Sequence, residues 1–340
     1  MVKEAVFKIT ENCPCDCAFC DSKEKYEKIL KKKTLSFEEW KSISDKLIKN
    51  GLEVVVISGG EPLLNSEITF KLIDYLHEHN IYVVLNTSGI VFKNNNLLEK
   101  LKMHFPNLLV FSIDSAYAAQ HNENRRTNGV FEKVIELIDN LNKDVIYPIA
   151  IRTVITKSNY KQLPKIIEDF NNRGIDCIKL TNIENDVEGK FRLDLKDLEC
   201  FDKVVRKEII QVLNKCEFED EELRNESIKK IKNLFNRNRI HYEKLSIGHF
   251  SPNLVGKAKC DLDGHFFAVQ SNGDVLLCCE AEHHYVPLLG NLLKSEVNEI
   301  LNSEEFLNFA NNRLDYCITC TQHHNLQINF SRKGNKVERR

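Results

Sequence analysis

The chain has 340 residues, of which 42% are hydrophobic and 29% are charged, and its formal net charge is −2. This length suffices for one large hydrophobic core or two modest domains. Near-neutral charge argues against a dedicated nucleic-acid-binding protein. No long apolar segment follows the N-terminus, and no run of about eighteen apolar residues occurs. We therefore expect a cytoplasmic protein that binds neither nucleic acid nor membrane.

Short apolar segments alternate with amphipathic segments in the first half of the chain. The expected strands are Ala5–Ile9, Glu53–Ser58, Tyr82–Leu85, Leu108–Ile113, Tyr147–Ile155 and Asp176–Leu180. The expected helices are Phe37–Asn50, Ile68–His79, Val130–Leu141 and Tyr160–Arg173. Continuous β-branched strands are typical of buried parallel sheets. The pattern predicts an α/β fold, either a partial barrel or a doubly wound sheet, with ligands at the carboxyl ends of the strands.

After Leu180 the alternation stops. Residues Asp194–Asn238 predict charged helices, which form either a solvated hairpin or a lid over the site. The segment HFFAVQSNGDVLLCC predicts two strands joined by a turn at Asn272-Gly273. From Thr319 onward we expect a loop that ends in a basic tail. The expected domains are residues 1–190, 191–250, 251–325 and 326–340.

Twelve cysteines in such a chain favour metal or redox chemistry over disulfides. Four of them, Cys13, Cys15, Cys17 and Cys20, follow the first expected strand. Cysteines this close together rarely reach disulfide geometry. The spacing C-x3-C-x2-C of Cys13, Cys17 and Cys20 suits a cubane iron–sulfur cluster with one iron left open. Cys15 fits no ligand role and is interpreted as a spare thiol, with exchange for Cys13 as the alternative.

A second set of cysteines surrounds the expected hairpin: Cys260, Cys278, Cys279, Cys317 and Cys320. Four such ligands can hold either zinc or a second iron–sulfur cluster, and the first cysteine loop favours the cluster. Only one of Cys278 and Cys279 can be a ligand, because successive side chains on a strand face opposite sides. The remaining Cys177, Cys200 and Cys216 lie on apolar faces and are expected to be packing thiols.

These motifs together resemble the radical S-adenosylmethionine (SAM) superfamily. The resemblance rests on the cysteine loop with Phe19 before its last cysteine, SGGEPLL at Ser58–Leu64, NTSG at Asn86–Gly89 and SID at Ser112–Asp114. The C-terminal cysteines resemble its SPASM/Twitch extension, in the form with one auxiliary cluster held by Cys260, Cys278, Cys317 and Cys320. The resemblance implies a partial (β/α)6 TIM-like barrel, a helical insert and a small auxiliary-cluster domain.

The resemblance also implies two 4Fe-4S clusters and bound SAM. Cys13, Cys17 and Cys20 would hold the first cluster, whose open iron takes the amino and carboxylate groups of SAM.

Further residues are expected to contact SAM. Gly59 and Gly60 would approach its methionine moiety, and Glu61 would accept from its ammonium group. The other expected contacts are Phe19, Asn86, Ser112, Arg125 and Leu180. Asn86 and Ser112 would face the ribose or carboxylate, or are plain strand-end polar residues. Arg125, or its neighbour Arg126, would bind the carboxylate, or Arg125 is a surface arginine. Leu180 packs against adenine or is a plain core leucine.

An electron donor such as flavodoxin or ferredoxin would start the reaction, and the cofactor would supply hydrogen abstraction from a substrate carbon. We expect modification of a ribosomally made peptide, by epimerisation or crosslinking. The alternatives are oxidation of a small secondary alcohol and a non-catalytic metal-binding protein. Only twelve residues precede Cys13, so an N-terminal peptide-binding domain is not expected. Cys279 is either a buried thiol or, as in related peptide epimerases, the donor of a hydrogen atom to the substrate radical.

Overall fold

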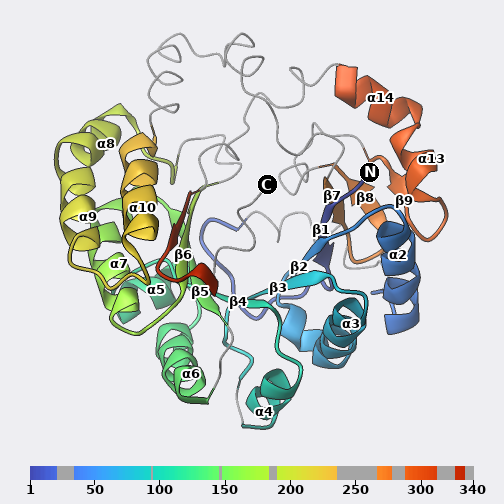
Figure 1. Ribbon diagram of the computed structural model, residues 1–340, viewed down its shortest axis with the longest axis horizontal. Coiled ribbons are helices and arrows are strands. Elements are labelled where there is room, and N and C mark those ends of the chain that lie inside the picture. Colours follow the sequence, from blue (N-terminus) through green and yellow to red (C-terminus); the bar gives the residue numbers. More distant parts are fainter. Residues whose placement is uncertain are drawn as a thin grey trace. The chain divides into compact units, whose positions relative to one another are not determined.

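The structure is a computed structural model that describes residues 1–20, 34–92, 95–144, 148–183, 190–235, 266–277, 288–311 and 326–333 (Figure 1). The chain divides into two compact units. The first unit comprises Met1–Asp16, Cys20–Leu109 and Lys259–Cys317. The second comprises Cys17–Phe19, Val110–Ala258 and Ile318–Arg340.

The first unit contains a sheet with strand order β3-β2-β1-β7-β8-β9. Its strands are β1 (Glu4–Lys8), β2 (Val54–Ser58), β3 (Tyr82–Thr87), β7 (Phe266–Val269), β8 (Asp274–Leu276) and β9 (Gly290–Asn291). Strand β1 is parallel to both β2 and β7, and β2 is parallel to β3, whereas β7, β8 and β9 are antiparallel. Its helices are α2 (Phe37–Lys49), α3 (Ser66–Glu78), α4 (Asn95–Met103), α13 (Val297–Leu301) and α14 (Glu304–Asn311).

Helix α2 shows how local sequence builds this unit. Ser36 and Glu39 form a capping box, in which each side chain bonds the other's backbone N–H. The buried residues Trp40, Ile43 and Leu47 recur at helical spacing and turn one face toward the sheet. Trp40 stacks on Phe7 of β1 with ring centroids 5.0 Å apart. The sheet and its first covering helix are thus joined by an aromatic pair.

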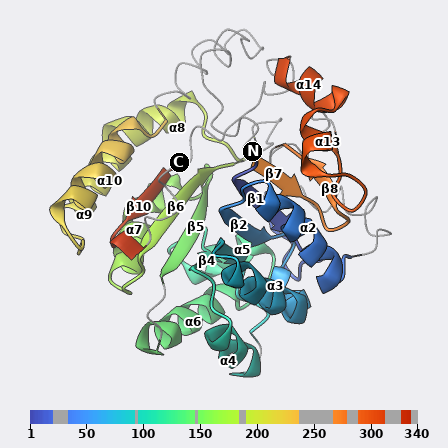
Figure 2. The same ribbon diagram turned by 45° about the vertical axis from the view of Figure 1, so that its right-hand side comes forward.

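The second unit contains a sheet with strand order β10-β6-β5-β4. Its strands are β4 (Leu108–Ser112, whose first two residues belong to the first unit), β5 (Ile149–Ile155), β6 (Cys177–Asn182) and β10 (Leu326–Asn329). Strand β5 is parallel to β6, and β10 is antiparallel to β6. Its helices are α5 (Ala118–Arg125), α6 (Val130–Asp144), α7 (Leu163–Asn171), α8 (Leu195–Cys200), α9 (Arg206–Leu213) and α10 (Glu221–Asn233). Helices α7, α9 and α10 lie on one side of β5, β6 and β10 (Figure 2).

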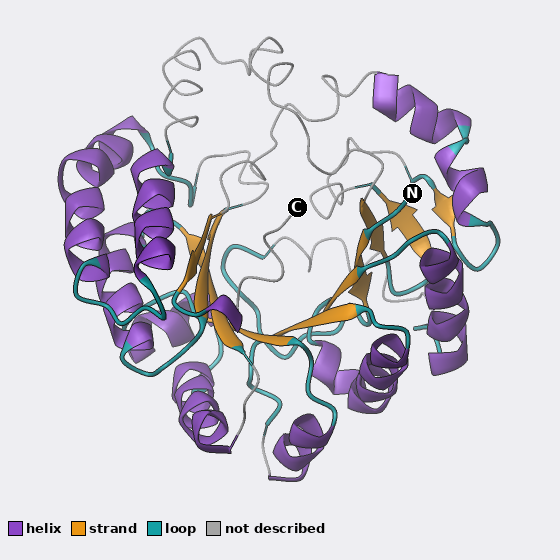
Figure 3. Ribbon diagram, viewed as in Figure 1, coloured by secondary structure: helices purple, strands orange, loops and turns teal. Residues whose placement is uncertain are grey.

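The expected alternation of parallel strands and helices is confirmed (Figure 3). The hairpin is confirmed as well: β7 and β8 pair across Gly273, whose φ of +84° suits glycine. The charged segment after Leu180 forms α8, a π-helical turn at Phe201–Val205, α9 and α10.

The expectation of a loop and basic tail across residues 326–340 is wrong for its first part. Leu326–Asn329 forms β10, which pairs with Leu180–Cys177 of β6. Four residues with polar Gln327 and Asn329 carry little strand signal by themselves, and the pairing partner is almost 150 residues away in the chain. The sequence pattern does not predict helices α4 and α5, which the structure contains. Within the described ranges, no helix is both long and apolar enough to cross a membrane.

Candidate functional site

The loop after β2 is bonded directly to the segment that leads into the cysteine loop. The N–H of Gly60 donates to the Thr10 carbonyl (2.6 Å), and the N–H of Glu61 donates to the Asn12 carbonyl (2.7 Å). A Cβ on Gly59 would lie within 3.0 Å of the Thr10 oxygen, and one on Gly60 within 3.0 Å of the Asn12 oxygen. The two glycines therefore let two backbones meet immediately before Cys13. This contact adds to the close approach to methionine that the sequence predicts.

Glu61 is completely buried and accepts four hydrogen bonds. One carboxylate oxygen accepts from the Thr87 hydroxyl (2.8 Å) and the Leu63 N–H (3.3 Å). The other accepts from the N–H (2.8 Å) and hydroxyl (2.6 Å) of Ser88. Burial raises the pKa of Glu61, and the bonds from Ser88, Thr87 and Leu63 oppose that rise. Glu61 thus joins the loop after β2 to the end of β3 and the residue that follows it. Thr87 and Ser88 belong to the NTSG motif, but the motif alone did not predict this role for them.

Replacing Glu61 by glutamine is expected to lower the free energy of unfolding by about 2 kcal/mol, because an amide NH₂ would face donors in place of an acceptor. Urea unfolding of Glu61→Gln measures this loss. The matched control is Glu67→Gln on α3, where the exposed carboxylate pairs with Lys71 at 2.8 Å. There the free energy of unfolding should change by no more than about 0.5 kcal/mol. Equal effects in the two variants would contradict the assigned role of Glu61.

The described cysteines of the loop differ in exposure, and none forms a disulfide. Cys20 is exposed, and Cys13 and Cys17 are half-buried. Cys15 is only 4% exposed. The three thiols in the C-x3-C-x2-C spacing are therefore the accessible ones, and Cys15 is not. This supports the prediction that Cys15 is not a ligand.

Arg125 of α5 lies against the end of the cysteine loop within the second unit. Its Nη1 donates toward the Cys17 sulfur at 3.5 Å, and its guanidinium lies 5.7 Å from the centre of the Phe19 ring. The N–H of Ala18 donates to the Asn124 carbonyl (2.8 Å), which ties the loop to α5 through the backbone. A cation beside Cys17 suits a thiolate, the form in which cysteine binds metal.

Asp114, the last residue of the SID motif, holds Arg125 in place. Its Oδ2 is 2.5 Å from Arg125 Nη2, and both side chains are at most 10% exposed. Its Oδ1 accepts from the Val154 N–H (3.2 Å), and its carbonyl accepts from the Asn159 amide (2.8 Å). The sequence did not assign this role to Asp114. The sequence signal that could have pointed to Asp114 is its carboxylate, two residues after Ser112 in a motif at the end of a strand.

His121 of α5 completes this group. Its Nδ1 accepts from the Asp114 N–H at 3.1 Å, and its ring meets Phe131 edge-on at 5.7 Å. The side chain is fully buried. Burial lowers the pKa of His121 from 6.5 to about 4, and the Asp114 charge opposes this shift.

The buried histidine predicts a pH dependence of stability. His121 takes up a proton near pH 4 in the folded protein but near pH 6.5 in the unfolded chain. The stabilisation of the folded protein that comes from its neutral imidazole is therefore complete above about pH 6.5 and is lost as the pH falls toward 4. The loss amounts to at most about 3 kcal/mol. The variant His121→Asn keeps an acceptor for the Asp114 N–H. Between about pH 7 and pH 5, urea unfolding should show that the free energy of unfolding falls less steeply in this variant than in the unmodified chain. An equally steep loss in both proteins would contradict this origin.

The remaining predicted contacts lie at strand ends. Asn86 is half-buried near the end of β3, and Ser112 is the last residue of β4. Phe19 packs edge-on against Phe191, with ring centroids 6.5 Å apart. Leu180 is fully buried on β6, which favours the core-leucine alternative over contact with adenine.

Several predicted residues lie outside the described ranges: Cys260, Cys278, Cys279, Cys317 and Cys320. Among the described residues, no three His, Cys, Asp or Glu side chains form a group that could hold a metal ion. Cys13 and Cys17 belong to different units. The ligand sets therefore stay predictions.

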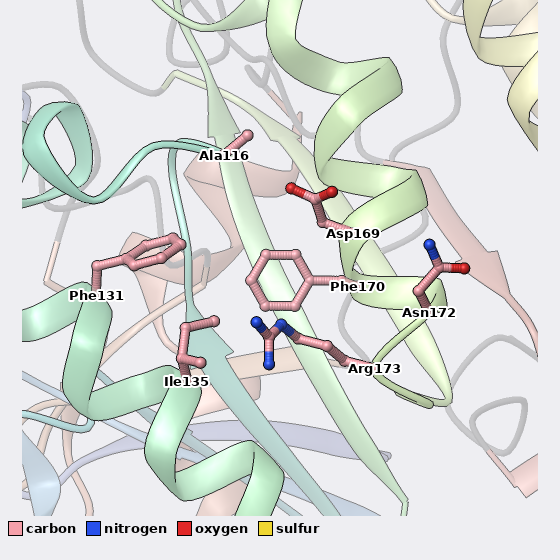
Figure 4. A pocket seen from close by; sticks show the side chains of 7 residues that line it. All are labelled: Ala116, Phe131, Ile135, Asp169, Phe170, Asn172 and Arg173. Atoms are coloured by element: carbon pink, nitrogen blue, oxygen red, sulfur yellow. The ribbon is translucent and has the colours of Figure 1, made fainter.

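A cavity of about 480 Å³ lies between α6 and α7 of the second unit (Figure 4). Phe131, Ile135 and Phe170 supply its apolar lining. Arg173 also lines it, and its Nη1 is 2.7 and 2.9 Å from the two carboxylate oxygens of Asp139. None of the described residues predicted for the site lines this cavity.

Models of known protein families match the two parts of the chain that carry these motifs. The model of the radical SAM superfamily matches residues 7–176, which include the cysteine loop, the Gly59–Glu61 loop and the Arg125–Asp114 pair. The chain belongs to the radical SAM superfamily. A second model, the SPASM iron–sulfur cluster-binding domain, matches residues 260–321. As a radical SAM protein with a SPASM domain, the chain is an enzyme that uses SAM and 4Fe-4S clusters.

Curated relatives match this radical SAM chain over part of their length. It is 28% identical to AdoMet-dependent heme synthase of Methanosarcina barkeri over 48% of this chain and 45% of the relative. It is 22% identical to PqqA peptide cyclase of Bradyrhizobium diazoefficiens over 53% of this chain and 46% of the relative. The matched region thus spans about half the length of these relatives.

Solved structures share the fold across most of the chain. Streptococcus suis SuiB bound to the precursor peptide SuiA has a TM-score of 0.67 at 18% identity, covering 94% of this chain and 71% of that one. Native anSMEcpe with AdoMet and the Cp18Cys peptide has a TM-score of 0.64 at 19% identity, covering 95% and 87%. These likenesses confirm the predicted partial-barrel fold class.

The thiols of the cysteine loop form no disulfide and have the chemistry that an iron–sulfur cluster requires. The thiols of Cys13, Cys17 and Cys20 are the donor set that the sequence predicts for a cluster with one open iron. When bound, the cluster and SAM supply one-electron cleavage of SAM and hydrogen abstraction. Within the first unit, Gly60 bonds the segment that leads into the cysteine loop. Within the second unit, Arg125, paired with Asp114, contacts Cys17.

Proposed function

We propose that this chain modifies a ribosomally made peptide, by epimerisation or crosslinking, through hydrogen abstraction started at the cysteine loop. The observation that carries the proposal is the pairing of a radical SAM match at residues 7–176 with a SPASM match at residues 260–321. A likeness that spans 94% of the chain to a SuiB structure bound to its precursor peptide supports the same reading.

The names of relatives lend further support. PqqA peptide cyclase and the subtilosin biosynthesis protein AlbA of Bacillus subtilis are both matched, the latter at 26% identity over 47% of this chain and 35% of the relative. The first name gives a peptide as what the relative acts on, and the second gives the bacteriocin subtilosin as what the relative helps to make. An electron donor of the flavodoxin or ferredoxin class would supply the reducing electron.

Chemistry on a small molecule is the second candidate. AdoMet-dependent heme synthase and GTP 3′,8-cyclase, a relative at 25% identity from Staphylococcus epidermidis, are named for small-molecule products or substrates. Oxidation of a secondary alcohol would need the auxiliary cluster only as an electron acceptor.

The test is anaerobic reconstitution of the full chain with iron, sulfide, SAM and reductant. The first arm supplies short peptides encoded beside this chain's gene, and the second supplies cyclitols with secondary alcohols. Formation of 5′-deoxyadenosine together with a modified peptide, found by mass spectrometry and chiral amino-acid analysis, is the expected result. Loss of two hydrogens from a cyclitol with no peptide changed would overturn the proposal. Absence of 5′-deoxyadenosine from fully loaded protein would reject both candidates.

Cys279 separates epimerisation from oxidation. A thiol that returns a hydrogen atom to the opposite face of a substrate radical inverts the carbon and carries solvent deuterium into the product. Cys279→Ala is therefore expected to keep SAM cleavage and both clusters while product inversion falls by at least about 100-fold, the scale of one donor group in catalysis. The measurement is chiral analysis of the product formed in deuterium oxide. Loss of the auxiliary cluster would instead make Cys279 the ligand and Cys278 its unbound neighbour.

A further inference from the structure

Arg125 contacts two partners at the end of the cysteine loop. Its Nη1 donates toward the Cys17 sulfur at 3.5 Å, and its Nη2 lies 2.5 Å from Asp114 Oδ2. One guanidinium can reach both, because its N–H groups diverge within a plane, and it stays charged in proteins. Arg125 therefore places a positive charge and an N–H donor against the sulfur of a predicted cluster ligand.

The pair of Arg125 and Asp114 lies inside the second unit, where charges act strongly on their neighbours. The two side chains are 10% and 0% exposed, respectively. Water and salt screen buried charges much less than exposed ones. Either charge therefore has a larger effect on a group beside Cys17 than the charge of an exposed ion pair would have.

Contacts with the surrounding strands and helix fix the position of Asp114. Its Oδ1 accepts from the Val154 N–H at 3.2 Å, and its carbonyl accepts from the Asn159 amide at 2.8 Å. Its own N–H donates to His121 Nδ1 at 3.1 Å. Asp114 can therefore hold the guanidinium of Arg125 in one orientation, because the carboxylate itself is held from several sides.

The backbone also holds Cys17 and Arg125 together. The N–H of Ala18, which follows Cys17, donates at 2.8 Å to the carbonyl of Asn124, which precedes Arg125. The Phe19 ring centre lies 5.7 Å from the guanidinium. The contact between the guanidinium and the sulfur therefore does not depend on side-chain rotamers alone.

A donor or a charge at a ligand sulfur changes how readily an iron–sulfur cluster is reduced. Reduction transfers one electron from an external donor to the cluster, and no bond of the protein forms or breaks. The reduced cluster carries one more negative charge, so an N–H bond to a ligand sulfur and a nearby positive charge favour reduction. A nearby negative charge opposes it.

We propose that Arg125 and Asp114 together set the reduction potential of the cluster that Cys17 is predicted to bind. Arg125 raises this potential through the Cys17 sulfur, and Asp114 limits the rise and keeps Arg125 in position. Asp114 is thus a positioning residue, which acts through Arg125. The inference does not depend on the substrate, so it applies equally to an enzyme that modifies a peptide and to one that oxidises a small molecule.

The test is an anaerobic redox titration of the full chain, reconstituted with its clusters, in which titanium(III) citrate is the reductant and EPR spectroscopy follows the reduced form. The EPR signal that changes when SAM is added identifies the first cluster, and its midpoint potential is then measured without SAM. The variants are Arg125→Met, Asp114→Asn and the two combined. The matched controls are Arg173→Met and Asp139→Asn, which break an exposed arginine–aspartate pair of the same unit, 2.7 Å apart.

The two single variants should shift the potential in opposite directions. Arg125→Met should lower the equilibrium constant for reduction about tenfold, or about 59 mV for one electron, because the positive charge is lost and the Asp114 charge remains. Asp114→Asn should raise it by about the same factor, since the amide oxygen still accepts from Arg125 while the negative charge is gone. The exposed control variants should change it less than about twofold.

The combined variant covers the case in which a single variant does not fold or load iron. It removes both members of the buried pair, so neither charge is left without the other. The net charge is kept and the bond to Cys17 is lost, so the constant for reduction should fall about threefold.

Three results would overturn the proposal. The first is an unchanged potential in the combined variant. The second is a shift of the same sign in both single variants, which is the result expected from a general disturbance of the loop. The third is a shift in Arg125→Met that appears only when SAM is bound, because Arg125 would then act on the carboxylate of SAM and not on Cys17.

Discussion

Replacing Cys13, Cys17 and Cys20 together by alanine is expected to remove roughly four of about eight irons per chain and to reduce SAM cleavage below detection. The reason is that each cubane holds four irons and the three thiolates are the predicted protein ligands of the one that binds SAM. Iron and sulfide analysis of anaerobically reconstituted protein, with quantification of 5′-deoxyadenosine, measures both effects.

Cys15→Ala is the matched control in the same loop. Its thiol is 4% exposed and outside the ligand spacing, so iron content and cleavage should stay as in the unmodified chain. A triple variant that keeps all its iron and its cleavage would reject the ligand assignment. Iron lost from Cys15→Ala and kept in Cys13→Ala would show that these two thiols exchange roles.

Gly60→Ala is expected to lower the free energy of unfolding by about 3 kcal/mol and to impair cluster loading, although Gly60 is not a predicted cluster ligand. The added Cβ would lie within 3.0 Å of the Asn12 carbonyl carbon and oxygen and of the Glu11 oxygen, all of which are backbone atoms that no rotamer change can move. The segment before Cys13 would have to shift, and its bond to Glu61 would break. Urea unfolding and iron analysis read out the two effects separately.

Gly129→Ala separates this clash from the general effect of adding a methyl group. Gly129 has a φ of +78°, and a Cβ there meets nothing within 4 Å. Only the backbone penalty of about 1 kcal/mol should appear, with normal cluster loading. If Gly60→Ala were no worse than Gly129→Ala, the close approach of the two loops would not be the reason for glycine at position 60.

Local patterns in the sequence predicted most of the elements that carry the site. The β-branched runs at β2 and β5 and the periodic apolar residues of α2 are signals that neighbouring residues create, so they can be read without the fold. The spacing of Cys13, Cys17 and Cys20 is local in the same sense, because a single loop must present all three thiols.

Strand β10 could not be predicted in this way. Leu326–Asn329 is a strand because β6 offers it an edge, and only the folded chain brings residues 177–180 to that segment. The expected loop was wrong for this reason.

Roles that depend on contact across the fold were also decided by the tertiary structure. The motif SGGEPLL predicted that Gly59, Gly60 and Glu61 belong to the site, but their partners Thr10, Asn12 and Ser88 come from loops after other strands. The sequence around a residue does not reveal a hydrogen-bond partner that is distant in the chain. Its neighbouring residues are of the kinds that occur at any strand end.

The sequence by itself determined three features: the spacing of three thiols, the loops that follow each strand, and the strand–helix alternation that sets those loops at the carboxyl ends of a parallel sheet. Only the tertiary structure decided that Asp114 holds Arg125 beside Cys17, and that β10 pairs with β6. The physical reason is register: the pairing of strands decides which side chains become neighbours, and hydrogen bonds between backbones that are far apart in the chain fix that pairing.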